Sequence, residues 1–263
     1  MSELMKVSEN TTPAPPAPPQ PEWPSRTQAV APWWHTALIA AIIIGVSVLS
    51  GMHAKAIGTG GGHIRRYVIT IVWEWALALL TLWGLRLRRT PLRQIYGARR
   101  GGLRQFALDF AIAIAFWIVA MVALGAIAFL LRILHLMPAQ KVVAAIVPQN
   151  LAQVIVWLLL CITAGIVEEF VFRGYLLQQF SSLRIIGGAR FNLCIGVIAS
   201  SLLFGAAHGY EGIGGMIVIT AYGAMFCILA IYRGSLRAGM IAHAWHDSIT
   251  GIIVAVAKHA RLL

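Results

Sequence analysis

Residues 151–176, "LAQVIVWLLLCITAGIVEEFVFRGYL", begin as an apolar run and then place Glu168, Glu169 and Arg173 almost side by side. A membrane-spanning helix needs roughly 17–25 predominantly apolar residues. Carboxylates are unfavourable where water is scarce unless they are paired or have a chemical task. The stretch therefore predicts a spanning helix whose charged end is offset by a partner or used in a reaction.

The whole chain shares this apolar character, because 59% of its 263 residues are hydrophobic and only 11% are charged. A soluble domain has about 25% charged residues. Helices satisfy their own backbone groups in lipid, so we predict an all-α polytopic membrane protein. Its bundle has seven or eight transmembrane helices, the eighth being a short re-entrant or interfacial piece at 140–150. The seven candidate spans are about 33–51, 67–85, 106–131, 151–173, 193–210, 213–232 and 238–257.

The net charge of +12 does not indicate nucleic-acid binding, because the arginines lie in short loops between apolar segments. Anionic lipid and membrane topology explain them. The loop 86–104 holds seven of them: Arg86, Arg88, Arg89, Arg93, Arg99, Arg100 and Arg104. This loop should be cytoplasmic, together with the loops of Arg184 and Arg190 and of Arg233 and Arg237, and with the N-terminus. The expected location is the plasma (inner) membrane.

Three regions follow along the chain. Residues 1–30 are Pro-rich and predict a disordered cytoplasmic tail. Residues 31–145 hold N-terminal transmembrane helices without a usable motif, and residues 146–258 hold the expected catalytic core. The three cysteines lack the pair spacing of a metal site and are expected to be buried, inert thiols.

Ionisable residues inside apolar spans are the main functional signal, because each is unfavourable there. Seven of the nine fall in three short stretches of the C-terminal half. The nine are Glu74, Asp109, Glu168, Glu169, Arg173, His208, His243, His246 and Asp247.

The first stretch has the pattern E-E-x-x-x-R. Glu169 and Arg173 are four residues apart and share a helix face, so an ion pair between them is expected. Glu168 points about 100° away from Glu169. One glutamate can thus be structural while the other remains available for chemistry.

The other stretches are "FGAAH", residues 204–208, and "HAWHD", residues 243–247. His243 and Asp247 share a face, as do Phe204 and His208. Together the three stretches supply carboxylates and imidazoles that could activate water and stabilise an oxyanion, or hold a zinc ion. Serine chemistry fits less well, since no G-x-S-x-G elbow is present.

The ordered set "EEFVFR", "FGAAH" and "HAWHD" resembles the EExxxR, FxxxH and HxxxN/D motifs of the CPBP family, which includes CAAX proteases (type II CAAX endopeptidases) and bacteriocin-processing (Abi) proteins. The resemblance covers about residues 150–250. It implies an intramembrane endopeptidase in which Glu168 activates water, supported by Glu169 and Arg173. His208 would be the second catalytic or metal-binding group. His243 and Asp247 would be ligands or oxyanion stabilisers.

The cofactor is left open by the same motifs. Zn²⁺ on His208, His243 and Glu168 and a metal-free mechanism are both compatible with them. Asp247 stands where the eukaryotic-type motif has Asn, and an Asp donates a hydrogen bond only when protonated. This favours metal ligation or an orienting contact with His243.

The expected substrate is a membrane-proximal, lipidated or membrane-anchored protein or peptide, and nucleic acid is not expected as a partner. A non-proteolytic immunity or scaffold protein of the same family is the alternative. A proton-relaying transporter is less suitable, because no internal repeat is present. For Glu168 and His208 to share a depth, the fourth helix must reach about Gln179 and the fifth must start near Asn192 or later. The oligomeric state and the roles of Glu74, Asp109 and His246 stay unassigned.

Overall fold

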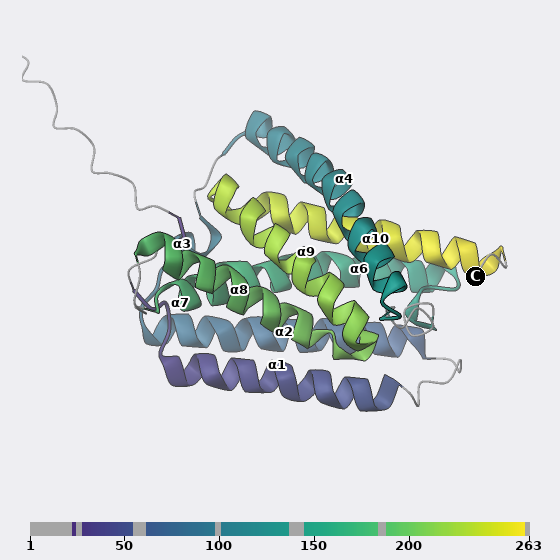
Figure 1. Cartoon of the computed structure of the whole chain (residues 1–263), viewed down its shortest axis with the longest axis horizontal. Helices are drawn as coiled ribbons and strands as arrows, with labels where there is room; N and C mark the ends of the chain where they lie inside the picture. Colours follow the sequence, from purple (N-terminus) through teal and green to yellow (C-terminus); the bar gives the residue numbers. More distant parts are fainter. Residues whose placement is uncertain are drawn as a thin grey trace, which may run out of the picture.

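The computed structural model describes residues 23–24, 28–54, 62–97, 101–136, 145–183 and 188–260, and these form an all-helical bundle (Figure 1). Within those ranges there is no strand, and a single β-bridge joins Gly97 to Ser235. The elements are α1 (Trp33–Ala54), α2 (His63–Leu87), α3 (Leu92–Tyr96), α4 (Leu103–Ile133), α6 (Leu151–Glu168), the π-helix η1 (Glu169–Leu176), α7 (Leu177–Ser181), α8 (Ala189–Ala207), the 3₁₀ turn η2 (Gly209–Glu211), α9 (Gly212–Arg233) and α10 (Arg237–His259).

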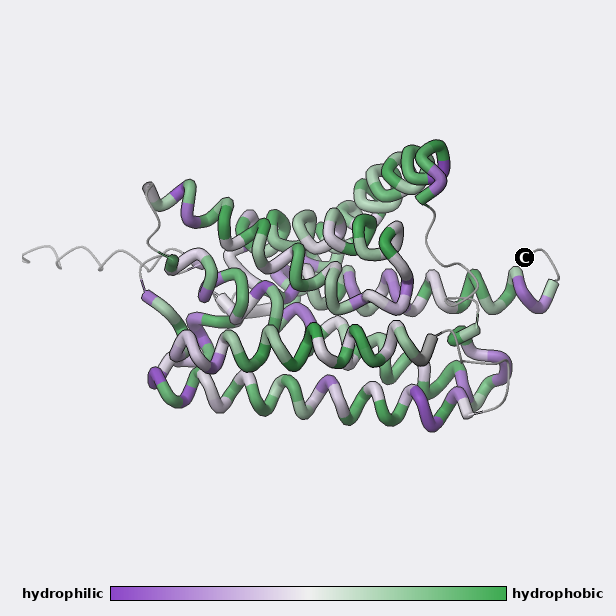
Figure 2. The backbone as a smooth tube through the Cα atoms, turned by 60° about the horizontal axis from the view of Figure 1, so that its bottom comes forward, coloured by the Kyte–Doolittle hydropathy of each residue, from purple (hydrophilic) through white to green (hydrophobic). Residues whose placement is uncertain are grey.

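Seven helical segments of the described chain are long and apolar enough to cross a membrane, which confirms the predicted class of fold. Figure 2 shows apolar colouring along most of their length, with polar colouring at several helix ends and also in the interior of the bundle. Each predicted span is recovered, and most are longer than hydropathy alone indicated. The third, for example, runs from Leu103 to Ile133.

The fourth span continues without a break through α6, η1 and α7 to Ser181. This confirms the long helix that the motif geometry required. The fifth helix, α8, begins at Ala189, three residues before the expected Asn192. Asn150 caps the start of α6, since its side chain accepts a hydrogen bond from the Gln153 amide at 3.0 Å, which satisfies an otherwise unpaired donor.

Three of the arginine-containing loops were expected on one side of the membrane. Two contacts agree with this: one joins α7 to the loop after α2, and the other joins the loop after α2 to the loop after α9. The Gln178 side chain donates to the Gln94 carbonyl at 3.0 Å, and the Leu236 amide donates to the Tyr96 carbonyl at 3.2 Å. Gly234 ends α9 with a φ of 59°, a conformation that glycine adopts without strain. The loops after α2 and α9 therefore meet at the same end of the bundle.

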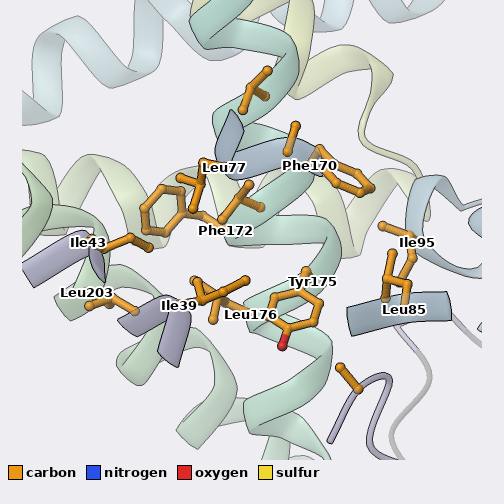
Figure 3. Packing of buried hydrophobic residues seen from close by; sticks show 14 of the residues in the cluster. Ile39, Ile43, Leu77, Leu85, Ile95, Phe170, Phe172, Tyr175, Leu176 and Leu203 are labelled. Carbon is orange, nitrogen blue, oxygen red and sulfur yellow. The ribbon is translucent and has the colours of Figure 1, made fainter. Parts of the chain in front are cut away.

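The core is built around η1, of which every residue is buried. Figure 3 shows Phe172 and Leu176 surrounded by Ile39 of α1, Leu77 of α2 and Leu203 of α8. The helix that bears the two glutamates is thus enclosed by helices from both halves of the chain.

Some expectations fall partly outside the described residues, including most of the proposed tail at 1–30 and residues 140–144 of the proposed eighth segment. The last part of the tail region is packed, because Val30 is buried and its amide donates to Gln179 at 2.9 Å. At the other end of the bundle, Tyr67 donates to the Ile146 carbonyl. The expectation that all three cysteines are buried is wrong for Cys194 of α8, which is exposed.

Candidate active site

The E-E-x-x-x-R motif lies where α6 changes into a π-helix, beginning at Glu169. A π-helix has i→i+5 backbone bonds and is found mostly as short insertions at functional sites. Glu168 is the last residue of α6 and Glu169 the first of η1. The change of helix type therefore occurs between the two carboxylates.

Glu169 and Arg173 form the predicted ion pair, with Arg173 Nη1 2.9 Å from Glu169 Oε1. Both side chains are almost completely buried. The guanidinium carbon lies 4.2 Å from the ring centre of Phe204 and 4.9 Å from that of Phe226, and Nη2 donates to the Gly223 carbonyl at 3.3 Å. A cation enclosed by aromatic faces is favourable, so ion pair and rings together offset the burial of both charges.

His243 of α10 joins the same carboxylate. Its Nδ1 is 3.0 Å from Glu169 Oε1, so this one oxygen receives both the arginine and the imidazole. The His243 ring also stacks on Phe226, with ring centres 5.2 Å apart. Because a carboxylate oxygen accepts, Nδ1 is the donor, and Nε2 is left for the remainder of the site.

Glu168 and Asp247 both lie near that free nitrogen. The Nε2 atom of His243 is 3.6 Å from Glu168 Oε2 and 3.6 Å from Asp247 Oδ2. These distances exceed a hydrogen bond. Glu168 Oε2 is buried and has no hydrogen-bond partner, although the side chain as a whole is 15% exposed, against 0% for Glu169. The two neighbouring glutamates thus have different surroundings, as their spacing predicted.

His208 approaches this group from the end of α8. Its Nδ1 lies 2.9 Å from the Phe204 carbonyl, so Nδ1 donates and Nε2 is an acceptor in the neutral ring. The Phe204 ring separates it from His243, with ring centres 5.1 Å from His208 and 6.1 Å from His243. His208 is close enough to Asp247 and Glu211 for their charges to interact.

The predicted zinc ligands are not arranged as a metal centre in this conformation. Among the described residues, no group of three or more His, Cys, Asp or Glu side chains is placed to hold a metal ion. His243 has one nitrogen engaged with Glu169, and His208 has one engaged with a carbonyl. We therefore derive no step through a metal, and zinc binding stays a prediction.

The structure shows the contacts of the three residues whose roles the sequence left unassigned. Asp109 of α4 forms ion pairs with Arg233 and Arg237, which join α4 to α9 and α10. His246 accepts from Trp117 of α4 at 3.3 Å. Glu74 of α2 is buried beside the site, within electrostatic range of Glu168, His243 and Asp247. Their apolar context was the signal in the sequence, but their partners lie on other helices.

The geometry defines an integral membrane protein with a buried polar site built from α6, η1, α8 and α10. Residues 149–249 match the model of a family described as "Type II CAAX prenyl endopeptidase Rce1-like". The match contains all three motifs and confirms the resemblance over this segment, which is less than half of the chain. At the family level it supports a CAAX-type intramembrane endopeptidase. Its description mentions neither bacteriocin processing nor a metal. No curated protein and no solved structure matched the chain.

Proposed function

We propose that this protein is an intramembrane endopeptidase that hydrolyses a peptide bond near the membrane surface, with Glu168 as the base that activates water. The observation that carries the proposal is the contrast between the two adjacent glutamates. Oε2 is buried without a partner in both residues, but Glu169 Oε1 accepts from Arg173 and His243, whereas Glu168 makes neither bond, is 15% exposed and places its Oε2 3.6 Å from His243 Nε2. A general base must have such a free acceptor.

In the proposed reaction, a water oxygen bonds to the scissile carbonyl carbon while Glu168 takes a proton from that water. The carbonyl oxygen becomes an oxyanion, which His243 stabilises through Nε2 when that nitrogen carries a proton. The carbon–nitrogen bond then breaks, and Glu168 returns the proton to the leaving amine. Glu169 orients His243 through Nδ1, Asp247 lies 3.6 Å from its Nε2, and His208 offers a second polar group on the opposite side of Phe204.

For the substrate, we propose a membrane protein or peptide with a lipidated C-terminal region. The family description supports this class, since it refers to prenyl endopeptidases. An apolar hollow on the outer side of the bundle between α8 and α9 is lined by Leu202, Ala206, Ile213, Met216, Ile217 and Thr220. It offers a surface for a hydrocarbon chain in a protein that contacts the bilayer. From the arginine distribution, we propose that the protein lies in the plasma (inner) membrane and that its N-terminus is in the cytoplasm.

The test uses the full chain in lipid nanodiscs with a farnesylated C-terminal peptide and the same peptide without its lipid, and mass spectrometry identifies the products. We expect cleavage of the lipidated peptide by the wild type and by His259→Gln, a matched control at the exposed end of α10. Glu168→Gln and His243→Gln should lose about 10²–10⁴-fold in rate, with thermal unfolding measured to confirm that each variant is folded.

Cleavage that survives both substitutions would overturn the site assignment. No cleavage of either peptide, together with a cellular effect that persists in Glu168→Gln, would favour the non-proteolytic scaffold instead. Each assay is repeated with a chelator. Loss of activity that added Zn²⁺ restores would support the metal-dependent form, and chelator-resistant cleavage with no metal by elemental analysis would support the metal-free form.

A further inference from the structure

Glu74 is a buried carboxyl group in the N-terminal half of the chain, outside the segment that matches the family. It lies on α2 and is 7% exposed, and its Oε2 is buried without a hydrogen-bond partner. An unpaired acceptor inside a membrane protein is unfavourable unless something donates to it. The described protein groups therefore leave Glu74 Oε2 without a donor.

The packing of α2 along α6 places Glu74 within about one helical turn of Glu168 in depth. At one end Tyr67 and Trp157 are in contact, with ring centres 5.4 Å apart. Glu74 follows Tyr67 by two helical turns on the same face, and Glu168 follows Trp157 by three turns on the same face. Just beyond Glu74, Leu77 packs in the same cluster as Val167 and Phe170.

Two buried hydrogen-bond acceptors at this position require a donor. Glu74 Oε2 and Glu168 Oε2 are both buried acceptors without partners, and both groups interact with the charges of His243 and Asp247 in the same polar interior. Two carboxylates cannot hydrogen-bond directly to each other without a proton. A water molecule can donate to both, and buried water typically bridges unsatisfied polar groups of this kind.

We propose that Glu74 is a catalytic residue that, together with Glu168, holds the attacking water. One water proton is directed to Glu168, which removes it, and the other to Glu74, which fixes the direction of the oxygen lone pair toward the scissile carbonyl. The inference rests on the proposed hydrolysis. It adds to the three motifs a fourth group, contributed by the N-terminal half.

The kinetic test compares Glu74→Gln, which keeps an acceptor oxygen, with Glu74→Leu, which does not. Thr70→Val on the exposed face of α2 is the control for removing a polar group. We expect Glu74→Leu to lower kcat roughly 100-fold, the size of effect that misplacing a reacting group produces. KM should be unchanged, Glu74→Gln should remain within about fivefold of the wild type, and Thr70→Val should behave as the wild type. Glu74→Leu with wild-type kcat, or Glu74→Gln as inactive as Glu74→Leu, would overturn the proposal.

A second measurement does not depend on cleavage. Thermal unfolding of Glu74→Leu, Glu168→Gln and the double variant should be non-additive by about 2 °C or more, because residues in one hydrogen-bond network couple. Additive shifts would overturn the shared water even if the wild type cleaves. Non-additive shifts in a protein that cleaves nothing would leave the two groups neighbours, but would reject both the catalytic role of Glu74 and the proposed hydrolysis.

Discussion

A single oxygen atom, Glu169 Oε1, receives hydrogen bonds from Arg173 on its own helical segment and from His243 on α10. Removing the charge of Glu169 leaves the buried guanidinium of Arg173 without a counter-ion. Breaking a buried pair in this way typically costs about 3–5 kcal/mol. The adjacent Glu168 has no partner to lose at Oε2.

We therefore predict opposite behaviour for the two isosteric substitutions. Glu169→Gln should lower the thermal unfolding temperature strongly and reduce activity with it. Glu168→Gln should abolish cleavage while unfolding at or above the wild-type temperature. Differential scanning fluorimetry and the peptide assay on the same preparations measure both quantities. Equal stability losses in the two variants would contradict the division of roles.

Arg173 provides a second prediction, because its charge is held between two aromatic rings. Lysine keeps the charge but lacks the planar group that donates to Glu169 and Gly223 while facing Phe204 and Phe226. Arg173→Lys should therefore still be clearly destabilised, though less than Arg173→Leu. Unfolding temperatures that are the same for wild type and Arg173→Lys would show that the charge alone suffices.

Residue spacing was informative wherever both partners lie on one helix. The Glu169–Arg173 pair and the shared face of His243 and Asp247 were predictable, because residues four apart meet on a helix. The contact between Glu169 and His243 was not predictable, since it depends on how η1 and α10 pack. The same holds for Glu74 and Asp109, whose apolar surroundings marked them without revealing their partners.

At the scale of elements, α6 and α10 approach closely at Gly165. A Cβ atom there would lie 2.8 Å from the Met240 carbonyl oxygen and 2.9 Å from the Ala244 amide, so alanine would force the helices apart. Because His243 lies between these two α10 residues, Gly165→Ala should lower both stability and cleavage.

Gly125→Ala on α4 is the matched control, since nothing lies within 4 Å of its added Cβ. It should be neutral or stabilising by up to about 1 kcal/mol, because alanine is the better helix former. Thermal unfolding and peptide cleavage of both variants give the comparison. Equal behaviour of the two would mean that α10 can move away from α6 without disturbing the site.

Hydropathy predicted the seven spans well, because each must present apolar side chains to lipid. It underestimated the length of several spans, since charged residues such as Arg65 and Arg66 at the start of α2 continue the helix beyond the apolar stretch. The π-helix was not predictable in this way. A change from i→i+4 to i→i+5 bonding alters no hydrophobic count, and it depends on how η1 packs among α1, α2 and α8.

For the whole molecule, α4 is the long helix that crosses the bundle obliquely in Figure 1. Its Asp109 is buried and ion-paired with Arg233 of α9 and Arg237 of α10. Asp109→Ala should therefore loosen α4 from both helices and leave Arg233 buried without its carboxylate.

Hydrogen–deuterium exchange in nanodiscs measures this effect. We expect faster exchange in α4 near Asp109 and a lower unfolding temperature, with little change in Arg132→Gln at the other end of α4, where the side chain is exposed. Unchanged exchange in Asp109→Ala would show that apolar packing alone holds α4 in place.

Buried side-chain amide and hydroxyl groups of α7 and η1 are hydrogen-bonded to the N-terminal part of the chain. Gln179 accepts hydrogen bonds from the amides of Val30 and Ala31, and Tyr175 is bonded to His35 and Thr36. The segment 149–249 consequently depends on these N-terminal residues and could not be transferred alone to another protein. If it were fused to unrelated helices, these polar groups would be buried without their partners. A chimera would therefore have to include the N-terminal end of α1 and the residues before it, together with the three motifs.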